Sequence, residues 1–135
     1  MDWNSPQLRY KIIDWINEDI GSGDLTQSCI TKKIGKALWI AKEDGIFCGI
    51  ELLKVIFNQI DKDINFHPLI RDSQKFKKNQ TLIELEGPSK SLLASERISL
   101  NIAMHLSGIS THTYNIVKKL KNTAIKLADT RKTTP

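Results

Sequence analysis

The sequence predicts an α+β domain in which helices cover one small sheet. The first observation behind this is the order of the periodic segments, which runs helix, strand, helix, two or three short strands, long helix, helix and final strand. The second is the composition. A chain of 135 residues with 40% hydrophobic and 26% charged residues is typical of one soluble domain with a real core.

The first part of the chain predicts two helices and one strand. Ser5 and Pro6 suit the N-cap and the first position of a helix over residues 6–18, along which apolar residues recur every fourth position. Residues 36–41 form the first expected strand. After a turn, Gly49 opens a second helix with one apolar face.

Two short strands are expected in the middle of the chain, over residues 64–68 and 81–86. In the second of these, Ile83 and Leu85 point to one side of the sheet, and the glutamates that alternate with them point to the other. The Gly87-Pro88-Ser89 sequence is expected to end this strand.

A long helix is expected next, with Ser89 or Ser91 as its N-cap. Apolar residues surround this helix on most sides, which predicts that it is buried. We expect Gly108 to break it, a more exposed helix to follow over residues 109–120, and a last strand over residues 125–128.

One polar line interrupts the apolar surface of the long helix. Arg97, Asn101 and His105 follow each other at intervals of four and therefore share a face. One interpretation is an internal network in which Glu96 pairs with Arg97 or with a lysine, because a buried charge needs a partner. The other is that Arg97 projects into a ligand site or a subunit interface, where its planar fork grips a carboxylate or phosphate.

The last seven residues form a second candidate site. An apolar strand leads into Asp129-Thr130-Arg131-Lys132, in which two cations stand beside hydroxyls and a carboxylate. This pattern is consistent with a solvated basic terminus. It is also consistent with an anion-binding strand end, because residues just past the carboxyl end of a barrel strand face the substrate.

The net charge of +5 and the pI near 9.3 suggest anionic partners. Nucleic acid is disfavoured, since the sequence has no recognisable binding motif, no basic stripe and no aromatics interleaved with its basic residues. A membrane span is disfavoured because no apolar run approaches the ~20 residues that it needs. No signal peptide is visible, and we expect a cytoplasmic protein.

Other familiar sites are weakly supported. Cys29 and Cys48 lie far apart and outside any Cys-x-x-Cys pattern, so we expect reduced thiols. The three histidines have no spacing typical of metal ligands. The Gly21-Ser22-Gly23 loop is interpreted as a structural turn, because the acids Asp19 and Asp24 beside it would repel a phosphate.

Several segments together resemble one enzyme family. They are residues 18–26, 44–49, 87–88, 95–101, 105–111 and 129–135, which include Ser95-Glu96-Arg97 and Asp129-Thr130-Arg131-Lys132. Their order and spacing over almost the whole chain resemble quinolinate phosphoribosyltransferase, the decarboxylating enzyme that makes nicotinate mononucleotide for NAD synthesis.

The resemblance implies an N-terminal α/β sandwich domain over residues 1–110. Residues 111–135 would then be a connecting helix and the first strand of an α/β barrel. It also implies quinolinate and phosphoribosyl pyrophosphate as substrates, Mg²⁺ as cofactor, and a homodimer with active sites shared between subunits. Arg97 would hold a quinolinate carboxylate in the partner's site, and Thr130, Arg131 and Lys132 would contact substrate in the chain's own barrel site.

The chain departs from the family in length. An α/β barrel takes about 200–250 residues, and this chain supplies one strand of it, so the other substrate-binding and acidic residues would lie beyond Pro135. We therefore expect the 135-residue chain to release no carbon dioxide by itself. Three readings remain open: part of the enzyme, a non-catalytic remnant that dimerises or binds anions, or a related pyrophosphorylase with another substrate.

Overall fold

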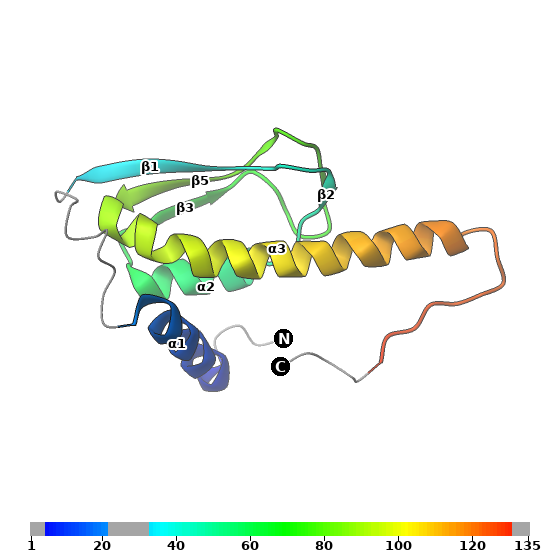
Figure 1. Cartoon of the computed structure of the whole chain (residues 1–135), viewed down its shortest axis with the longest axis horizontal. Helices are drawn as coiled ribbons and strands as arrows, with labels where there is room; N and C mark the ends of the chain where they lie inside the picture. The colour runs from blue at the N-terminus through cyan, green and yellow to red at the C-terminus, as the bar shows by residue number, and fades with distance from the viewer. Residues whose placement is uncertain (1–4, 22–32, 131–135) are drawn as a thin grey trace.

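The computed structural model describes residues 5–21 and 33–130, and within them it contains three helices and two small antiparallel sheets (Figure 1). In chain order the elements are α1 (Pro6–Ile20), β1 (Ile34–Ile40), β2 (Gly45–Ile46), α2 (Ile50–Ile60), β3 (Asn65–Pro68), β4 (Lys75–Phe76), β5 (Thr81–Pro88) and α3 (Ser89–Leu120).

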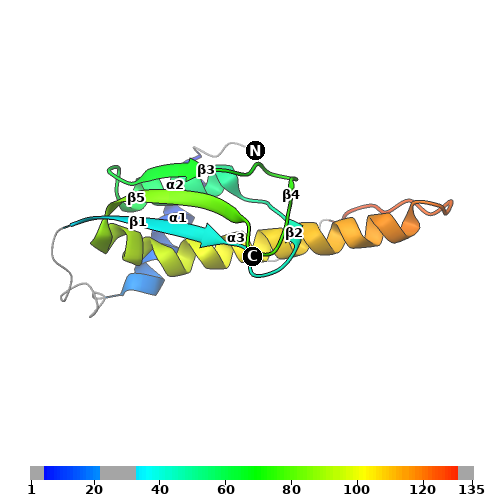
Figure 2. The same cartoon turned by 90° about the horizontal axis from the view of Figure 1, so that it is seen from above.

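The larger sheet has the strand order β1-β5-β3, and β2 pairs with β4 in the smaller one. Both α2 and α3 run beneath the larger sheet, and α1 packs against them on the side away from it (Figure 1). The second half of α3 projects past the three strands (Figure 2). The predicted α+β domain with helices covering a small sheet is confirmed.

The central strand β5 shows the alternation that the sequence predicts. Ile83 and Leu85 are buried under the helices, while Glu84 and Glu86 are exposed on the opposite face. The strand does not stop at Gly87 but continues to Pro88. A Cβ atom at Gly87 would lie 3.1 Å from the Asp63 carbonyl oxygen, so glycine allows the close approach of this neighbouring segment.

The start of α2 confirms the expected role of Gly49. Gly49 is the N-cap residue and has a φ of 124°, in the region that L side chains rarely adopt. The cap that receives the helix N–H groups is Asp72, whose carboxylate accepts from the amides of Gly49 at 2.8 Å and Ile50 at 3.1 Å. This cap comes from a loop 23 residues later in the chain, so local sequence patterns could not have revealed it.

The long helix α3 differs from its prediction in three ways. It runs without a break through Gly108, because one glycine costs a helix only about 1 kcal/mol. It is not buried all round before Gly108, since Leu93 and Met104 are exposed. Neither expected serine caps it: the Ser89 hydroxyl donates to the Lys33 carbonyl, and the Ser91 hydroxyl donates to Asp61.

The segment after α3 also differs from its prediction. Residues 125–128 have no regular secondary structure, and every residue from 121 to 130 is exposed. A strand needs a neighbour for its backbone hydrogen bonds, and none of the described strands pairs with this segment. Because α3 passes straight through residue 110, it does not mark the expected division between residues 1–110 and 111–135, which stays a prediction.

Two hydrophobic clusters hold the layers together. The larger one joins the inner face of the sheet to α2 and α3 and includes Phe57 and Ile83. The smaller one joins the three helices through Ile12 of α1, Ile56 of α2 and Ile98 of α3. This second cluster fixes α1 against the early part of α3, where the candidate site lies.

Candidate functional site

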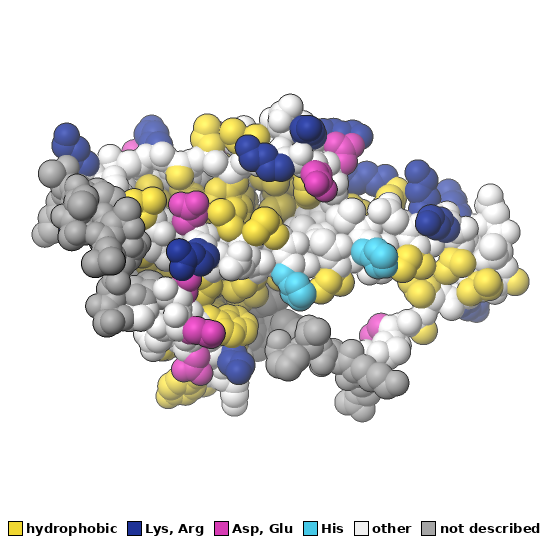
Figure 3. Space-filling view, in the orientation of Figure 1, with side chains coloured by type: hydrophobic (Ala, Val, Ile, Leu, Met, Phe, Trp, Pro, Cys, Tyr) yellow, Lys and Arg dark blue, Asp and Glu magenta, His cyan; other side chains and the backbone are white. Residues whose placement is uncertain are grey.

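The exposed side of α3 carries the polar line that the sequence singled out. We call this the outer face of α3, and it consists of Leu93, Arg97, Asn101, Met104 and His105, all of which are exposed. Their spacing places them on one side of the helix. Hydrophobic, acidic, basic and histidine side chains lie next to one another over this helix (Figure 3). Such a mixed surface is suited to contact with another molecule.

Arg97 is the cation of this face, and its partner is Asp19. Its Nη1 atom lies 3.0 Å from Asp19 Oδ1, and the Arg97 side chain is 74% exposed. The predicted internal network, in which Arg97 or a lysine pairs with Glu96, is therefore wrong. A helix with so many apolar residues looks buried in sequence, but the sheet, α1 and α2 cover only one of its sides.

The location of Asp19 follows from how α1 packs. Ile12 is fully buried and belongs to the same cluster as Ile98, the residue next to Arg97. This contact holds the last turn of α1 within reach of Arg97. The pair joins residues 78 positions apart in the chain, and no sequence pattern points to it beyond an acid at a helix end.

The opposite side of α3 is lined by small residues. Ser95 and Ser99 are fully buried, and their hydroxyls donate to carbonyls of the helix itself, those of Leu92 and Ser95. Further along, the Ser107 hydroxyl accepts from the Cys48 amide at 3.1 Å. Small buried side chains allow α3 to lie close to its neighbours, and this fixes the direction in which Arg97 points.

A second group of cations lies near the end of α3. The Lys75 ammonium donates to the Tyr114 hydroxyl and also lies 4.4 Å from the centre of its ring. This hydrogen bond, together with the nearby charges of Lys75, Lys118 and Lys121, lowers the pKa of Tyr114 below its usual value of 10.0. The sequence analysis did not identify this cluster.

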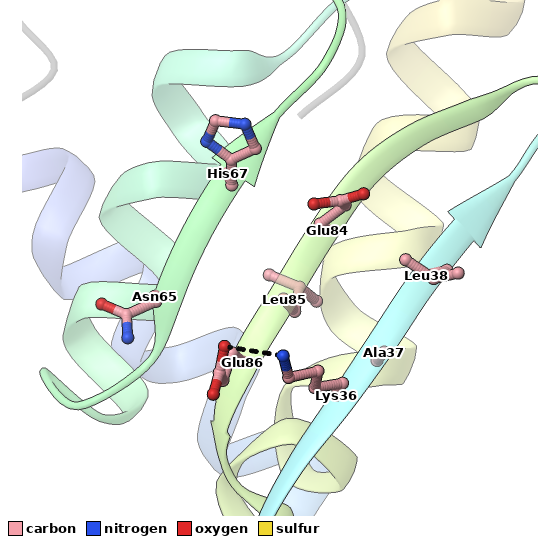
Figure 4. A pocket seen from close by; sticks show the side chains of 8 residues that line it. All are labelled: Lys36, Ala37, Leu38, Asn65, His67, Glu84, Leu85 and Glu86. Carbon is pink, nitrogen blue, oxygen red and sulfur yellow. Dashed lines mark ion pairs between the residues drawn. The ribbon is translucent and has the colours of Figure 1, made fainter.

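The outer face of the three-stranded sheet has a shallow hollow (Figure 4). Its charged lining is partly neutralised, since Lys36 Nζ lies 3.5 Å from Glu86 Oε2. Glu84 of β5 and His67 of β3 stand opposite each other in the strand register, on the same face of the sheet. None of the predicted site residues lies here.

The remaining predicted site residues lie at the end of the chain. Thr130 is exposed in the segment that follows α3 (Figure 1), whereas Arg97 lies in the first third of that helix. Arg131 and Lys132 fall outside the described residues, so their predicted roles stay predictions.

Neither a metal site nor a membrane-spanning helix occurs within the described ranges. They contain no group of three His, Cys, Asp or Glu side chains placed to hold a metal ion. Among the same residues, no helix combines the length and the apolar character that a bilayer crossing requires. Cys48 is a free thiol, and Cys29 lies outside the described part.

Comparison with known proteins shows which family and which relatives the chain resembles. The family described as "Quinolinate phosphoribosyl transferase, N-terminal domain" matches residues 24–107. The chain is 39% identical over 133 residues to a probable nicotinate-nucleotide pyrophosphorylase (carboxylating) of Bacillus subtilis. That alignment covers 98% of this chain and 46% of the relative, so the chain spans about half the length of the curated relatives that it matches.

Solved structures give the same result. The nicotinate-nucleotide pyrophosphorylase from Francisella tularensis superposes with a TM-score of 0.89 at 36% identity, over 95% of this chain and 46% of that one. The protein of the same name from Ehrlichia chaffeensis superposes with a TM-score of 0.85 at 32% identity, over 100% of this chain and 49% of that one.

Proposed function

Because the chain belongs to the quinolinate phosphoribosyl transferase family and matches its N-terminal domain, we propose that it forms the N-terminal part of a carboxylating nicotinate-nucleotide pyrophosphorylase. Such an enzyme transfers the phosphoribosyl group of phosphoribosyl pyrophosphate to quinolinate. The products are nicotinate mononucleotide, carbon dioxide and pyrophosphate. The observation that carries this proposal is the similarity over 98% of the chain to a relative of that name.

In this proposal Arg97 binds a carboxylate of quinolinate. The guanidinium is exposed on a helix that is anchored along its opposite side, so it is presented from a rigid support. A planar guanidinium and a planar carboxylate form two parallel hydrogen bonds. Thr130, Arg131 and Lys132 would supply hydroxyl and cationic contacts to the anionic substrates in the chain's own site.

The site would be completed by a second copy of the chain. The outer face of α3 exposes apolar residues beside Arg97, among them Leu93 at 40% and Met104 at 62%. Docking of a partner subunit on this face would cover those residues and direct Arg97 into the partner's site. A homodimer with shared sites is therefore part of the proposal.

The chemistry assigned to this part of the enzyme is electrostatic. As pyrophosphate leaves, positive charge builds on the ribose carbon that the quinolinate nitrogen attacks. The protein contributes by holding two anionic substrates in line rather than by covalent catalysis. Mg²⁺ would neutralise the leaving pyrophosphate with few protein ligands, and the described residues offer no ligand set that fits it.

The test is a chimera in which residues 1–135 replace the matching N-terminal segment of the Bacillus subtilis relative. We expect release of carbon dioxide that depends on both quinolinate and phosphoribosyl pyrophosphate. A folded chimera without this activity would overturn the proposal. Activity with a different aromatic acid in place of quinolinate would instead indicate a related pyrophosphorylase.

The role of Arg97 is tested in the same chimera. Arg97→Ala removes a charged hydrogen bond to substrate, and we expect the KM for quinolinate to rise about ten- to a hundredfold. Lys90→Ala, which removes a cation about two turns before Arg97 on the same helix, serves as the control. An unchanged KM for quinolinate in Arg97→Ala would exclude the substrate contact.

Dimer formation is tested separately by sedimentation equilibrium. Met104→Glu places a charge on an exposed apolar position of the outer face, and we expect it to weaken association of the chimera about tenfold or more. Lys54→Glu changes an exposed residue on α2 and should leave association unchanged. Equal association of Met104→Glu and the parent would rule out this interface.

A further inference from the structure

The ion pair between Arg97 and Asp19 is asymmetric. The Arg97 side chain is 74% exposed, whereas the Asp19 side chain is only 19% exposed. The carboxylate is thus held within the protein at the end of α1, and the guanidinium extends from it toward solvent. The acid is therefore the more buried member of the pair, and the arginine is the more exposed one.

Fold stability does not account for this pair. Ion pairs with an exposed partner add little to stability, because solvent screens them and because ordering a long side chain costs entropy. The contact between α1 and α3 is already secured by the buried side chains of Ile12 and Ile98. With a stabilising role excluded, Asp19 is left with one effect, which is to hold the Arg97 guanidinium in position.

The geometry leaves Arg97 able to bind a ligand. A guanidinium has five N–H donors, and the described part of the chain engages only one nitrogen, Nη1, in a single contact of 3.0 Å. The other donors take part in none of the contacts of the described residues, and the side chain is 74% exposed. A second carboxylate can therefore bind while the first remains in place.

We propose that Asp19 is a positioning residue, which holds the Arg97 guanidinium in the orientation that receives a substrate carboxylate. This inference rests on the proposed function, because the orientation of Arg97 matters only if Arg97 contacts substrate. Asp19 itself does not touch the substrate. It reduces the freedom that Arg97 would otherwise lose on binding.

Asp19 could also affect substrate binding by charge repulsion, and this effect has the opposite sign from positioning. Asp19 brings a negative charge close to a site for a dicarboxylate, and simple repulsion predicts that removing this charge strengthens substrate binding. Positioning predicts that removing it weakens binding. The direction in which the KM for quinolinate changes therefore distinguishes the two.

The experiment uses Asp19→Asn in the chimera described above. We expect the KM for quinolinate to rise about three- to fivefold, the range that the loss of one partly exposed ion pair produces. The KM for phosphoribosyl pyrophosphate and kcat should stay within about twofold of the parent, and Asp19→Glu should recover part of the loss. Asp14→Asn is the matched control, because it removes an equal charge from an exposed position on α1.

The double variant Asp19→Asn/Arg97→Ala completes the test. If Asp19 acts through Arg97, Asp19→Asn adds nothing to the effect of Arg97→Ala. A lower or unchanged KM for quinolinate in Asp19→Asn, while Arg97→Ala raises it, would overturn the positioning role and leave the proposed function standing. No effect of Arg97→Ala would instead remove the role of Arg97 and, with it, that of Asp19.

Discussion

The buried and outer faces of α3 differ in the kind of side chain that each uses. The buried face carries Ser95, Ser99 and Ala103 beside the larger Ile98, while the outer face carries the long side chains of Leu93, Arg97 and Met104. Hydrophobicity alone does not tell the two faces apart, because both contain apolar residues. The small side chains on the buried face allow α3 to lie close against its neighbours, and the large Ile98 fills the space between the three helices.

The comparison predicts the largest effect for a large side chain on the buried face. Ile98→Ala leaves a cavity in the cluster that joins the three helices, and we expect the free energy of unfolding to fall by about 2–4 kcal/mol. Met104→Ala, on the outer face, should change it by no more than about 0.5 kcal/mol. Urea unfolding of the chain measures both. Equal losses would show that the two faces do not differ in burial.

A partly buried hydrogen bond gives the next largest effect. The Ser107 hydroxyl accepts from the Cys48 amide, and Ser107→Ala leaves this amide without a partner, at a cost of about 1–3 kcal/mol. Hydrogen exchange at the Cys48 amide should become faster in the same variant. Thr113→Ala is the control, because it removes an exposed hydroxyl from the same helix. Unchanged exchange at Cys48 would contradict the contact.

A substitution at Gly108, on the exposed side of α3, should raise the free energy of unfolding and not lower it. Gly108 is exposed within the continuous helix, and no neighbouring atom lies within 4 Å of the position of an added Cβ. Gly108→Ala should therefore raise the free energy of unfolding by about 0.5–1 kcal/mol. A loss of stability would mean that α3 bends at this position, as its sequence first suggested.

Much of the fold can be predicted from local sequence patterns. The helix over 6–18, the strand over 81–86 and the turn into α2 at Gly49 were all predicted, because periodicity and turn residues act over a few positions. The two-residue strand β4 is too short to give a periodic signal. The strand expected over 125–128 has no partner among the described strands.

The sequence predicts which residues of the candidate site share a helix face, but it does not predict what they contact. The spacing of Arg97, Asn101 and His105 correctly placed them on one face, but spacing does not show whether a neighbouring element covers that face. The contact of Arg97 with Asp19 depends on how α1 packs through Ile12. Contacts of this kind are properties of the tertiary structure, so they had to be read from the fold.

The smallest predicted effect depends on pH and concerns the first turn of α3. The Ser91 hydroxyl and the Asp63 amide donate to Asp61 and hold the pKa of this carboxyl below its ordinary value of 3.8. Since the folded-state pKa is lowered, the stabilisation is present above about pH 4 and is lost as the pH falls through the folded-state pKa.

Ser91→Ala tests this link between Asp61 and stability. The variant should have a lower urea midpoint than the parent at pH 7, and the difference should shrink as the pH falls through the lowered pKa of Asp61 in the folded parent. Thr113 has no such carboxylate partner among the described contacts. Any change in the urea midpoint that Thr113→Ala causes should therefore not depend on pH. If the difference for Ser91→Ala stays the same from pH 7 down to the acid end of the range in which the parent remains folded, the hydroxyl stabilises the start of α3 without acting through the charge of Asp61.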